Sequence, residues 1–225
     1  MFSKKKQLTS QQLFGLAVGG VLTAGNGERF DRLATRWGRF RARKMLKDSW
    51  DIENTADVYE TFRWLFEEGH RTVYSDCVDR VICGNTILDD ETELSVETCH
   101  VIRTNLAVFQ THGFDSWDFS RLIIAARFAF SAKFIDESAA WKWIILSAHE
   151  IQKSSTSWFD SGRSFMNGFL IWSSMLGIPE DTWVTQAYRR LHHSPDSVWR
   201  NIDWNTKLNP DGWMQSTVDT VYRGA

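Results

Sequence analysis

The stretch SWDFSRLIIAARFAFSAKF, residues 116–134, decides the fold of this chain. Drawn as a helix at about 100° per residue, it points apolar side chains in nearly every direction. A helix that is apolar all round normally lies at the centre of its fold. We therefore predict a central helix over 116–134, with the other elements of the chain packed around it.

Before Lys133 near its end, an aspartate and two arginines interrupt this apolar segment, and a buried charge needs a partner. Asp118 and Arg121 lie about 60° apart on one side of the helix, so they can pair with each other. Arg127 points about 180° away from Asp118, and its own helix offers it no carboxylate. We therefore expect Arg127 to reach a carboxylate on another helix, for which the candidates are Glu67, Glu68, Glu150 and Asp160. Two roles stay open: a buried ion pair that fixes the packing of the helices, or a polar pocket for an anionic or carbonyl-bearing ligand.

The composition is that of an ordinary globular protein. The chain has 225 residues, 43% of them hydrophobic and 24% charged, and we expect one domain over 1–225. A formal net charge of -2 argues against a general polyanion binder. Twelve tryptophans exceed ordinary usage, and large aromatic side chains serve cores and interfaces alike. Cys77, Cys83 and Cys99 show no C-x-x-C spacing, which favours a reduced, cytoplasmic location.

The N-terminus has two features of a secretory signal, because three lysines at 4–6 precede an apolar run at 13–21. However, Thr9 and Gln12 form the T-x-x-Q pattern of a capping box, which starts an ordinary helix. The run is also shorter than the ~20 residues that a bilayer span needs. We therefore expect a structural helix here, and no membrane span in the chain.

Caps and breakers predict the other helices. One helix is expected over 29–48, one from Asn54 to a stop at Gly69, and one from an acidic start at 89 to Gly113. Three more are expected to follow Asp136, Ser157 and Pro179. The run 73–82 is ambiguous. No stretch alternates with period two for long enough to require a sheet, so we predict an all-α bundle of about eight helices with an irregular, Trp-rich strap after Pro195. Four helices are expected to open on a Ser or Thr cap followed by Trp, at 49–50, 116–117, 157–158 and 182–183.

Several motifs follow one another in a fixed order along the chain. They are Trp50-Asp51; Trp64-Leu65 with Gly69-His70-Arg71; Trp117-Asp118 with Arg121 and Arg127; Phe134-Ile135-Asp136 with Ala140-Trp141; Ser157-Trp158 with Gly162, Ser164, Gly168 and Trp172; and Ser194-Pro195 with Trp199, Ile202 and Trp204. In these motifs, over about residues 10–205, the chain resembles the bacterial domain-of-unknown-function family 1266 (DUF1266). It departs from the family at Phe134, where a Tyr is usual.

The resemblance implies a bacterial origin and a single compact domain, with residues 206–225 as a C-terminal tail. Because the function of the family is not established, the resemblance assigns no catalytic residue and no cofactor. It singles out a set of Trp, Arg and Asp positions: Asp118, Arg121, Arg127, Trp158 and Trp172.

Familiar catalytic and metal-binding motifs are missing from the sequence. The segment HEIQK at 149–153 lacks the second His of H-E-x-x-H, and the adjacent His192 and His193 cannot face one another on a helix. We therefore predict no metal site and no cofactor, and whether the chain is an enzyme stays open. His70 and Arg71 follow a helix end, where they are expected to bind its last carbonyls; the alternative is a general base at His70 or His149.

The segment 36–47 carries six positive charges and no acid. A solvated cationic face is its simplest explanation. Docking on an acidic partner, including this chain's own acidic segment 89–97, comes next, and contact with nucleic acid or a membrane surface comes last because the total charge is balanced.

Three functional hypotheses follow. The first, which the sequence favours, is an interaction or regulatory module that binds another protein through aromatic and Arg anchors, with the candidates Trp158, Trp172, Trp199, Trp204, Trp213, Arg36, Arg39 and Arg43. The second is a small-molecule binder or hydrolytic enzyme with a polar pocket that takes a small anionic ligand, with the candidates Asp118, Arg121, Arg127, His149, Glu150, His70 and Arg71. The third is a nucleic-acid accessory protein that uses 36–47.

Overall fold

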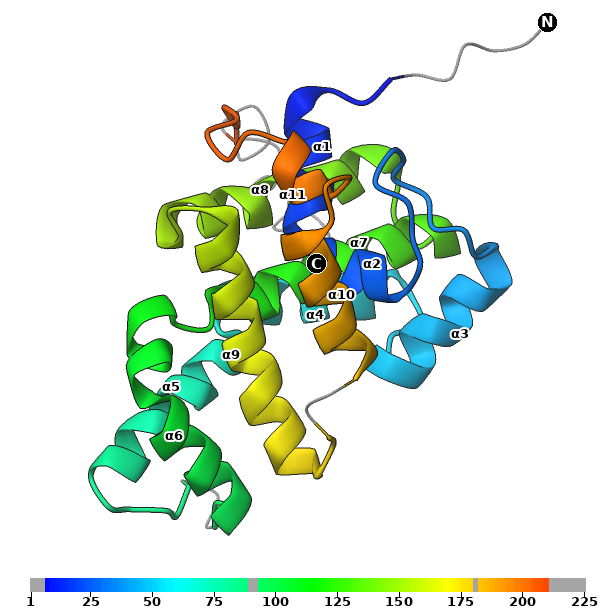
Figure 1. Cartoon of the computed structure of the whole chain (residues 1–225). Helices are drawn as coiled ribbons and strands as arrows, with labels where there is room; N and C mark the ends of the chain where they lie inside the picture. Colours follow the sequence, from blue (N-terminus) through cyan, green and yellow to red (C-terminus); the bar gives the residue numbers. More distant parts are fainter. Residues whose placement is uncertain (1–6, 89–92, 180–181, 211–225) are drawn as a thin grey trace, which may run out of the picture.

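Helices form almost all of the regular structure in the computed structural model, which describes residues 7–88, 93–179 and 182–210 (Figure 1). In chain order they are α1 (Ser10–Val18), α2 (Gly20–Gly25), α3 (Arg39–Trp50), α4 (Thr55–Glu67), α5 (Gly69–Ile82), α6 (Val96–His112), α7 (Asp115–Ala132), α8 (Glu137–Ser154), α9 (Trp158–Leu176), α10 (Trp183–His193) and α11 (Val198–Asn201). Extended segments pair in the described residues only at an isolated bridge between Ile87 and Glu93. The predicted all-α bundle is confirmed.

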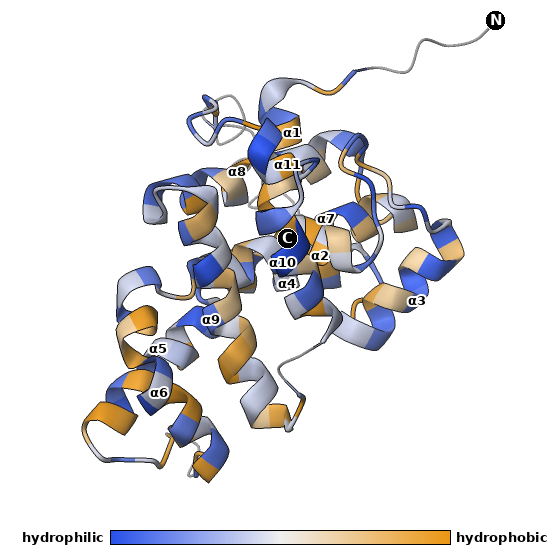
Figure 2. Ribbon diagram, in the orientation of Figure 1, coloured by the Kyte–Doolittle hydropathy of each residue, from blue (hydrophilic) through white to orange (hydrophobic). Residues whose placement is uncertain are grey.

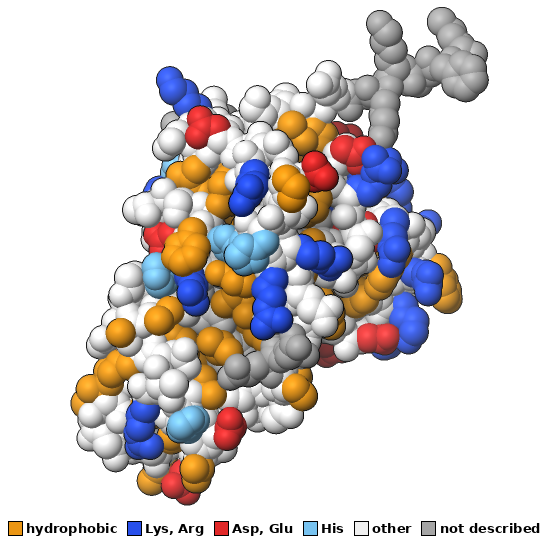
Figure 3. All heavy atoms as spheres, in the orientation of Figure 1, with side chains coloured by type: hydrophobic (Ala, Val, Ile, Leu, Met, Phe, Trp, Pro, Cys, Tyr) orange, Lys and Arg blue, Asp and Glu red, His pale blue; other side chains and the backbone are white. Residues whose placement is uncertain are grey.

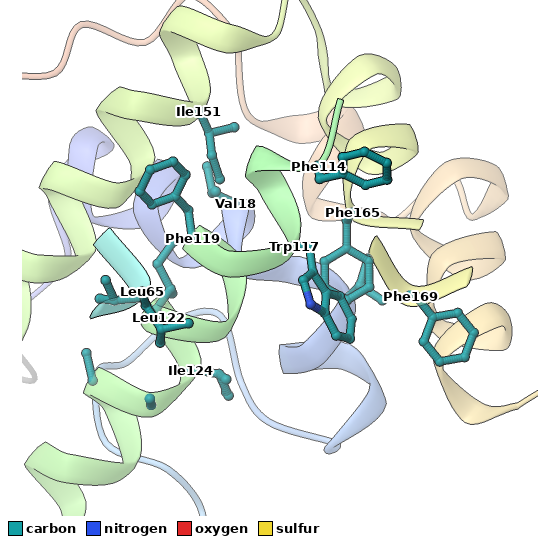
Figure 4. Packing of buried hydrophobic residues seen from close by; sticks show 14 of the residues in the cluster. Val18, Leu65, Phe114, Trp117, Phe119, Leu122, Ile124, Ile151, Phe165 and Phe169 are labelled. Atoms are coloured by element: carbon teal, nitrogen blue, oxygen red, sulfur yellow. The ribbon is translucent and has the colours of Figure 1, made fainter. Parts of the chain in front are cut away.

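Helix α7 is the centre of the bundle, as the sequence predicts. Of its 18 residues, 14 are buried, and it packs against α3, α4, α8 and α9 as well as the N-terminal helices. Figure 4 shows Trp117 of α7 against Phe165 of α9, and Leu122 beside Leu65 of α4. Gly168 allows α9 to approach this closely, because a Cβ there would lie 2.4 Å from the Cβ of Trp117. The hydrophobic faces of the surrounding helices therefore converge on α7.

Arg127 is fully buried, but its partners are not the carboxylates that we expected. Its guanidinium donates to the carbonyls of Arg29 (2.7 Å), Arg32 (3.2 Å) and Leu33 (3.2 Å) and to the hydroxyl of Thr23 (3.1 Å). The predicted contact with Glu67, Glu68, Glu150 or Asp160 is wrong. Burial lowers the pKa of Arg127 to about 10, and the charges of Glu28 and Asp31 oppose this shift.

The same contacts explain a second error in the prediction. The segment 29–38 is an irregular loop, and the helix that we expected over 29–48 begins only at Arg39. A carbonyl inside a helix accepts a hydrogen bond from the backbone four residues later. The carbonyls at 29, 32 and 33 accept from Arg127 instead, and the backbone N–H of Thr35 donates to the hydroxyl of Ser131, so two side chains of α7 hold this loop.

Most of the predicted caps are present. Thr9 with Gln12 and Asn54 with Asp57 form capping boxes, and Asp136 and Ser157 accept hydrogen bonds from the first turns of α8 and α9. The predicted Ser/Thr-Trp starts at 157–158 and 182–183 are confirmed, because Ser157 and Thr182 cap α9 and α10. Two predicted starts are wrong: Trp50 ends α3, and α7 begins before Ser116.

One other boundary differs from the prediction, and the C-terminal strap agrees with it. The ambiguous run 73–82 belongs to α5, which begins directly at Gly69, so the predicted stop of α4 is also the start of the next helix. The strap after Pro195 contains α11 and then an irregular path to residue 210. In the described residues there are nine longer helices besides the short α2 and α11, which agrees with the prediction of about eight.

Polar and apolar residues are distributed unevenly over the surface. Figure 2 shows hydrophilic residues along much of α3, and hydrophobic residues at the ends of α5 and α6 that lie farthest from α3. Within the described residues, no helix is both long enough and apolar enough to cross a membrane.

We predict that Arg127→Lys lowers the free energy of unfolding by about 3 kcal/mol, because an ammonium group cannot reach four acceptors and leaves buried carbonyls unpaired. Chemical denaturation followed by circular dichroism measures this. The control is Arg103→Lys at an exposed position of α6, for which we expect a change below about 0.5 kcal/mol. Equal effects of the two substitutions would contradict the role of Arg127 as an anchor.

Candidate functional site

Four of the seven predicted pocket residues meet where α4, α5 and α7 come together. Asp118 and Arg121 come from the first two turns of α7, and His70 and Arg71 come from the first turn of α5. Arg127 lies nine residues after Asp118 on α7, which places it about 13 Å further along the helix axis. The structure therefore brings the Gly-His-Arg motif and the Trp-Asp motif into one site.

Asp118 is fully buried and is surrounded by donors. Its Oδ2 accepts a hydrogen bond from the backbone N–H of Arg71 at 2.7 Å, and its Oδ1 lies 3.2 Å from Nη1 of Arg121 and 3.6 Å from Nδ1 of His70. The residue before α5, Glu68, makes no side-chain cap. Asp118 thus caps α5 from another helix, where the positive end of the helix dipole also stabilises its charge.

Gly69 makes this contact possible. Its φ of +65° favours glycine, and a Cβ at this position would lie 2.3 Å from Oδ2 of Asp118. Any side chain here would push the carboxylate away from the start of α5. Gly69 is therefore required both by the backbone conformation and by the close approach of Asp118.

Arg71 connects the same junction to the end of α4. Its Nη1 and Nη2 donate to the carbonyls of Leu65 (2.6 Å) and Phe66 (2.7 Å), and its guanidinium lies 4.8 Å from the centre of the Phe119 ring. The expectation that this motif binds the last carbonyls of the preceding helix is confirmed for Arg71. Its donors are used within the protein.

Several contacts hold Arg121, but only one of its three nitrogens makes a hydrogen bond in the described residues. Its guanidinium lies over the rings of Trp50 (4.8 Å) and Trp117 (5.1 Å), and its Nη1 also donates to Nδ1 of His70 at 2.6 Å. Within the described residues, no hydrogen bond is made by its Nε or Nη2. Burial lowers the pKa of Arg121, and the charge of Asp118 opposes this shift.

His70 is fixed in one tautomer by this contact. A guanidinium group only donates hydrogen bonds, so Nδ1 of His70 accepts and the ring proton lies on Nε2. The ring also contacts the edge of Trp64, with centroids 4.9 Å apart. The ring of His70 is thereby oriented by Arg121 and Trp64.

An open groove of about 570 Å³ lies over Arg121. The end of α3 forms one wall and α4 forms the other, and the lining residues are Lys47, Asp48, Ser49, Trp50, Asp51, Thr61, Trp64 and Arg121. Such a groove, with aromatic walls and an oriented guanidinium, suits a carboxylate, phosphate or carbonyl group, which accepts paired hydrogen bonds from arginine.

The other predicted pocket residues lie elsewhere. His149 and Glu150 pair with each other at 3.5 Å on α8, and His149 lines a separate hollow beside Trp204 of the strap. Neither contacts Asp118 or Arg121. The predicted single pocket is therefore wrong for Arg127, His149 and Glu150.

The predicted interface tryptophans are mostly packed inside. Trp158 and Trp199 are buried and stack on each other at 5.9 Å, and Nε1 of Trp199 donates to the carbonyl of Ala17. Trp172 and Trp204 are half-buried, and Trp213 lies outside the described residues. The prediction of exposed anchors in the strap is wrong for Trp199, and Trp158 does not offer a free surface either.

The basic segment is also only partly available. Arg43 is half-buried, donates to the carbonyl of Ala132 at 3.1 Å and lies over the ring of Phe134. Lys44 pairs with Asp48, and Lys47 pairs with Glu53. Arg36 and Arg39 are exposed. A continuous cationic face over 36–47 is therefore not present, although its first part is free.

Sequence reasoning missed a cluster around the start of α9. His112 and Asp160 pair at 2.5 Å between α6 and α9, and His192 of α10 packs on Trp199 with its Nε2 buried and unpaired in the described structure. No pattern in the sequence connects these distant positions. In the described residues no three His, Cys, Asp or Glu side chains are grouped as a metal ion would require.

The fold and the site define an all-α domain with an arginine-centred groove, and this class alone assigns no activity. The model of the protein family described as "Protein of unknown function (DUF1266)" matches residues 45–204, so the chain belongs to this family. The match begins later than the residue 10 that we expected. No curated protein and no solved structure matches the chain.

We predict that Gly69→Ala lowers the free energy of unfolding by more than about 2 kcal/mol, because the new methyl group meets Asp118. Gly84→Ala is the matched control, since Gly84 also has a positive φ (+75°) but no atom stands within 4 Å of its added Cβ. It should lose only about 1 kcal/mol. Thermal and denaturant unfolding compare the two, and equal losses would show that the contact with Asp118 contributes nothing.

We predict that His192 makes the protein less stable in acid. Burial, helped by the charges of His193 and Arg163, lowers the pKa of His192 from 6.5. The unfolded state therefore binds more protons below pH 6.5, and the free energy of unfolding falls as the pH drops through this range. His192→Phe should reduce this slope, measured by denaturation at several pH values, whereas His100→Phe at an exposed position should leave it unchanged.

Proposed function

We propose that this protein binds a small ligand through an anionic or carbonyl oxygen in the groove over Arg121. The observation that carries the proposal is the pair of unused donors, Nε and Nη2, on a guanidinium whose side chain is only 16% exposed. Asp118 and two tryptophan rings hold this group in one orientation. A ligand would therefore meet a donor pair that loses little freedom on binding.

The walls of the groove support the same function. Trp50 and Trp64 offer apolar surface for the body of a ligand, while Arg121 provides the charged contact. Asp48 and Asp51 on the α3 side disfavour a ligand with many negative charges. A small molecule with one acidic or carbonyl group fits this arrangement best.

The competing hypotheses have less support at this site. The interaction hypothesis relied on exposed tryptophans, and Trp199 is buried. The nucleic-acid hypothesis relied on the whole segment 36–47, half of which is paired internally. An interaction role keeps one observation in its favour, the exposed hydrophobic side chains at the ends of α3, α6 and α9.

We predict that the protein, captured with a small tag from its own cells, retains a mass of a few hundred daltons in native mass spectrometry. Arg121→Gln should lose this mass, because the amide cannot replace the charged donor pair. Thr61→Trp should also lose it by filling the groove, without touching the pair of Arg121 and Asp118. Arg63→Gln removes the same charge from an exposed position of α4 and should retain the mass.

A second measurement covers a ligand that dissociates during purification. Acetate, succinate and inorganic phosphate are titrated while the indole N–H resonances of Trp50 and Trp64 are followed by NMR. We expect shifts that Arg121→Gln removes and Arg63→Gln preserves. A bare mass together with no shift from any of these anions would overturn the proposal.

A further inference from the structure

The two most exposed large hydrophobic side chains lie at separate ends of the molecule. Val96, at the start of α6, is 87% exposed, and Phe40, in the first turn of α3, is 84% exposed. Figure 1 shows α3 on one side of the bundle, away from the ends of α6 and α9. A single exposed hydrophobic side chain is normal on a protein surface, so the charges and hollows around these two residues decide whether they mark an interaction site.

The end at Phe40 is a hydrophobic knob in cationic surroundings. Arg39 and Arg41 flank Phe40, and Arg36 precedes it; all three arginines are exposed. In the described structure none of them forms an ion pair. The first turn of α3 holds no acid, and Gly38 gives no side-chain cap, so the positive end of the helix dipole adds to these charges. In Figure 3, Lys and Arg side chains gather along this edge of the molecule.

The other end is a socket of mixed lining with one carboxylate at its side. A pocket of about 270 Å³ lies between the first turns of α6 and the end of α9; its apolar lining residues are Val101, Leu170, Ile178 and Pro179, and Glu97, Ser173, Ser174 and Gly177 complete it. A cavity of about 150 Å³ is enough to hold a benzene ring. The socket is therefore large enough for one phenyl group. The neighbouring residues Val96, Met175 and Leu176 in the same two helix ends are also exposed.

We propose that two copies of this chain associate head to tail, with Phe40 of one copy in the socket of the other and Arg39 or Arg41 beside Glu97. The charges choose this partner, because the knob is cationic and the socket carries a carboxylate. Within one molecule the contact is excluded, since α3 packs on α7, away from the socket.

The contact is heterologous, so it leaves a free knob at one end and a free socket at the other, and further copies add to the same chain. It buries a small area, which makes it weak and reversible. The contact would also bring the basic segment 36–47 to the acidic segment 89–97, as the sequence suggests, but between two molecules. Residues 89–92 of the acidic segment lie outside the described structure.

Sedimentation velocity over micromolar to millimolar concentrations tests the contact. The wild-type sedimentation coefficient should rise with concentration and rise less at high salt, because the charged rim is screened. Phe40→Ala and Glu97→Lys should each weaken association by about tenfold or more. Val73→Ala, which shortens an exposed hydrophobic side chain of α5 outside the contact, should behave like the wild type.

A mixing experiment tests the head-to-tail geometry. Phe40→Ala keeps an intact socket, and Glu97→Lys keeps an intact knob. Each variant alone should associate about tenfold or more weakly than the wild type, while an equimolar mixture should form dimers and nothing larger, because each molecule keeps only one intact end. Both positions are exposed, so Phe40→Ala should keep the wild-type melting curve by circular dichroism, and Glu97→Lys, which replaces the acid in the first turn of α6, should lower the melting temperature by only a few degrees.

Three results would overturn the proposal. They are a wild-type protein that is monomeric throughout the concentration range, variants that associate as strongly as the wild type, and a mixture that stays monomeric. The last result would point to a symmetric contact in which both copies use the same surface. None of these outcomes bears on the groove over Arg121, so the two proposals are tested separately.

Discussion

The burial of charge in α7 is the constraint on which the rest of the structure depends. Asp118 and Arg127 have no exposed surface, yet both lie on the helix around which the bundle is built. A buried charge without partners would cost several kcal/mol, so the surrounding chain must supply opposite chemistry at two points. At Asp118 it supplies the backbone N–H of Arg71 and the guanidinium of Arg121. At Arg127 it supplies backbone carbonyl oxygens. Two connections, the α4–α5 junction and the loop before α3, are placed by these requirements.

The α4–α5 junction shows how strongly the first requirement acts. The backbone N–H of Arg71 donates a hydrogen bond to Asp118, and its guanidinium donates to the last carbonyls of α4. One residue thus satisfies the end of one helix and connects the start of the next to α7. The two helices need no loop between them, because Gly69 makes the turn alone. The site at Arg121 is a product of this arrangement, since His70 enters it from the same turn.

The sequence predicts what depends on local pattern. The apolar character of 116–134 identifies α7, and the capping residues Thr9 and Asn54 locate two helix starts, because both signals are contained within a few neighbouring residues. The partners of Arg127 could not be predicted, since backbone carbonyls exist at every position and leave no mark in the sequence. The pairing of Asp118 with Arg121 follows from their spacing on one helix, whereas the contact of Arg121 with His70 joins positions 51 residues apart. Trp199 was misjudged because a tryptophan serves a core and an interface equally well.

Arg121 and Arg127 show why one arginine of α7 is structural and the other is functional in our proposal. Both lie on the same helix, and burial lowers the pKa of both. Arg127 uses all three of its nitrogens on acceptors of the bundle, so nothing remains for a ligand. Arg121 uses one nitrogen on Asp118 and His70, and its other two nitrogens meet no acceptor among the residues that the structure describes, although the flanking rings exclude much of the solvent. A structural role alone would favour an arrangement like that of Arg127, with every donor satisfied. The unused donors of Arg121 are therefore the feature that an external oxygen explains best.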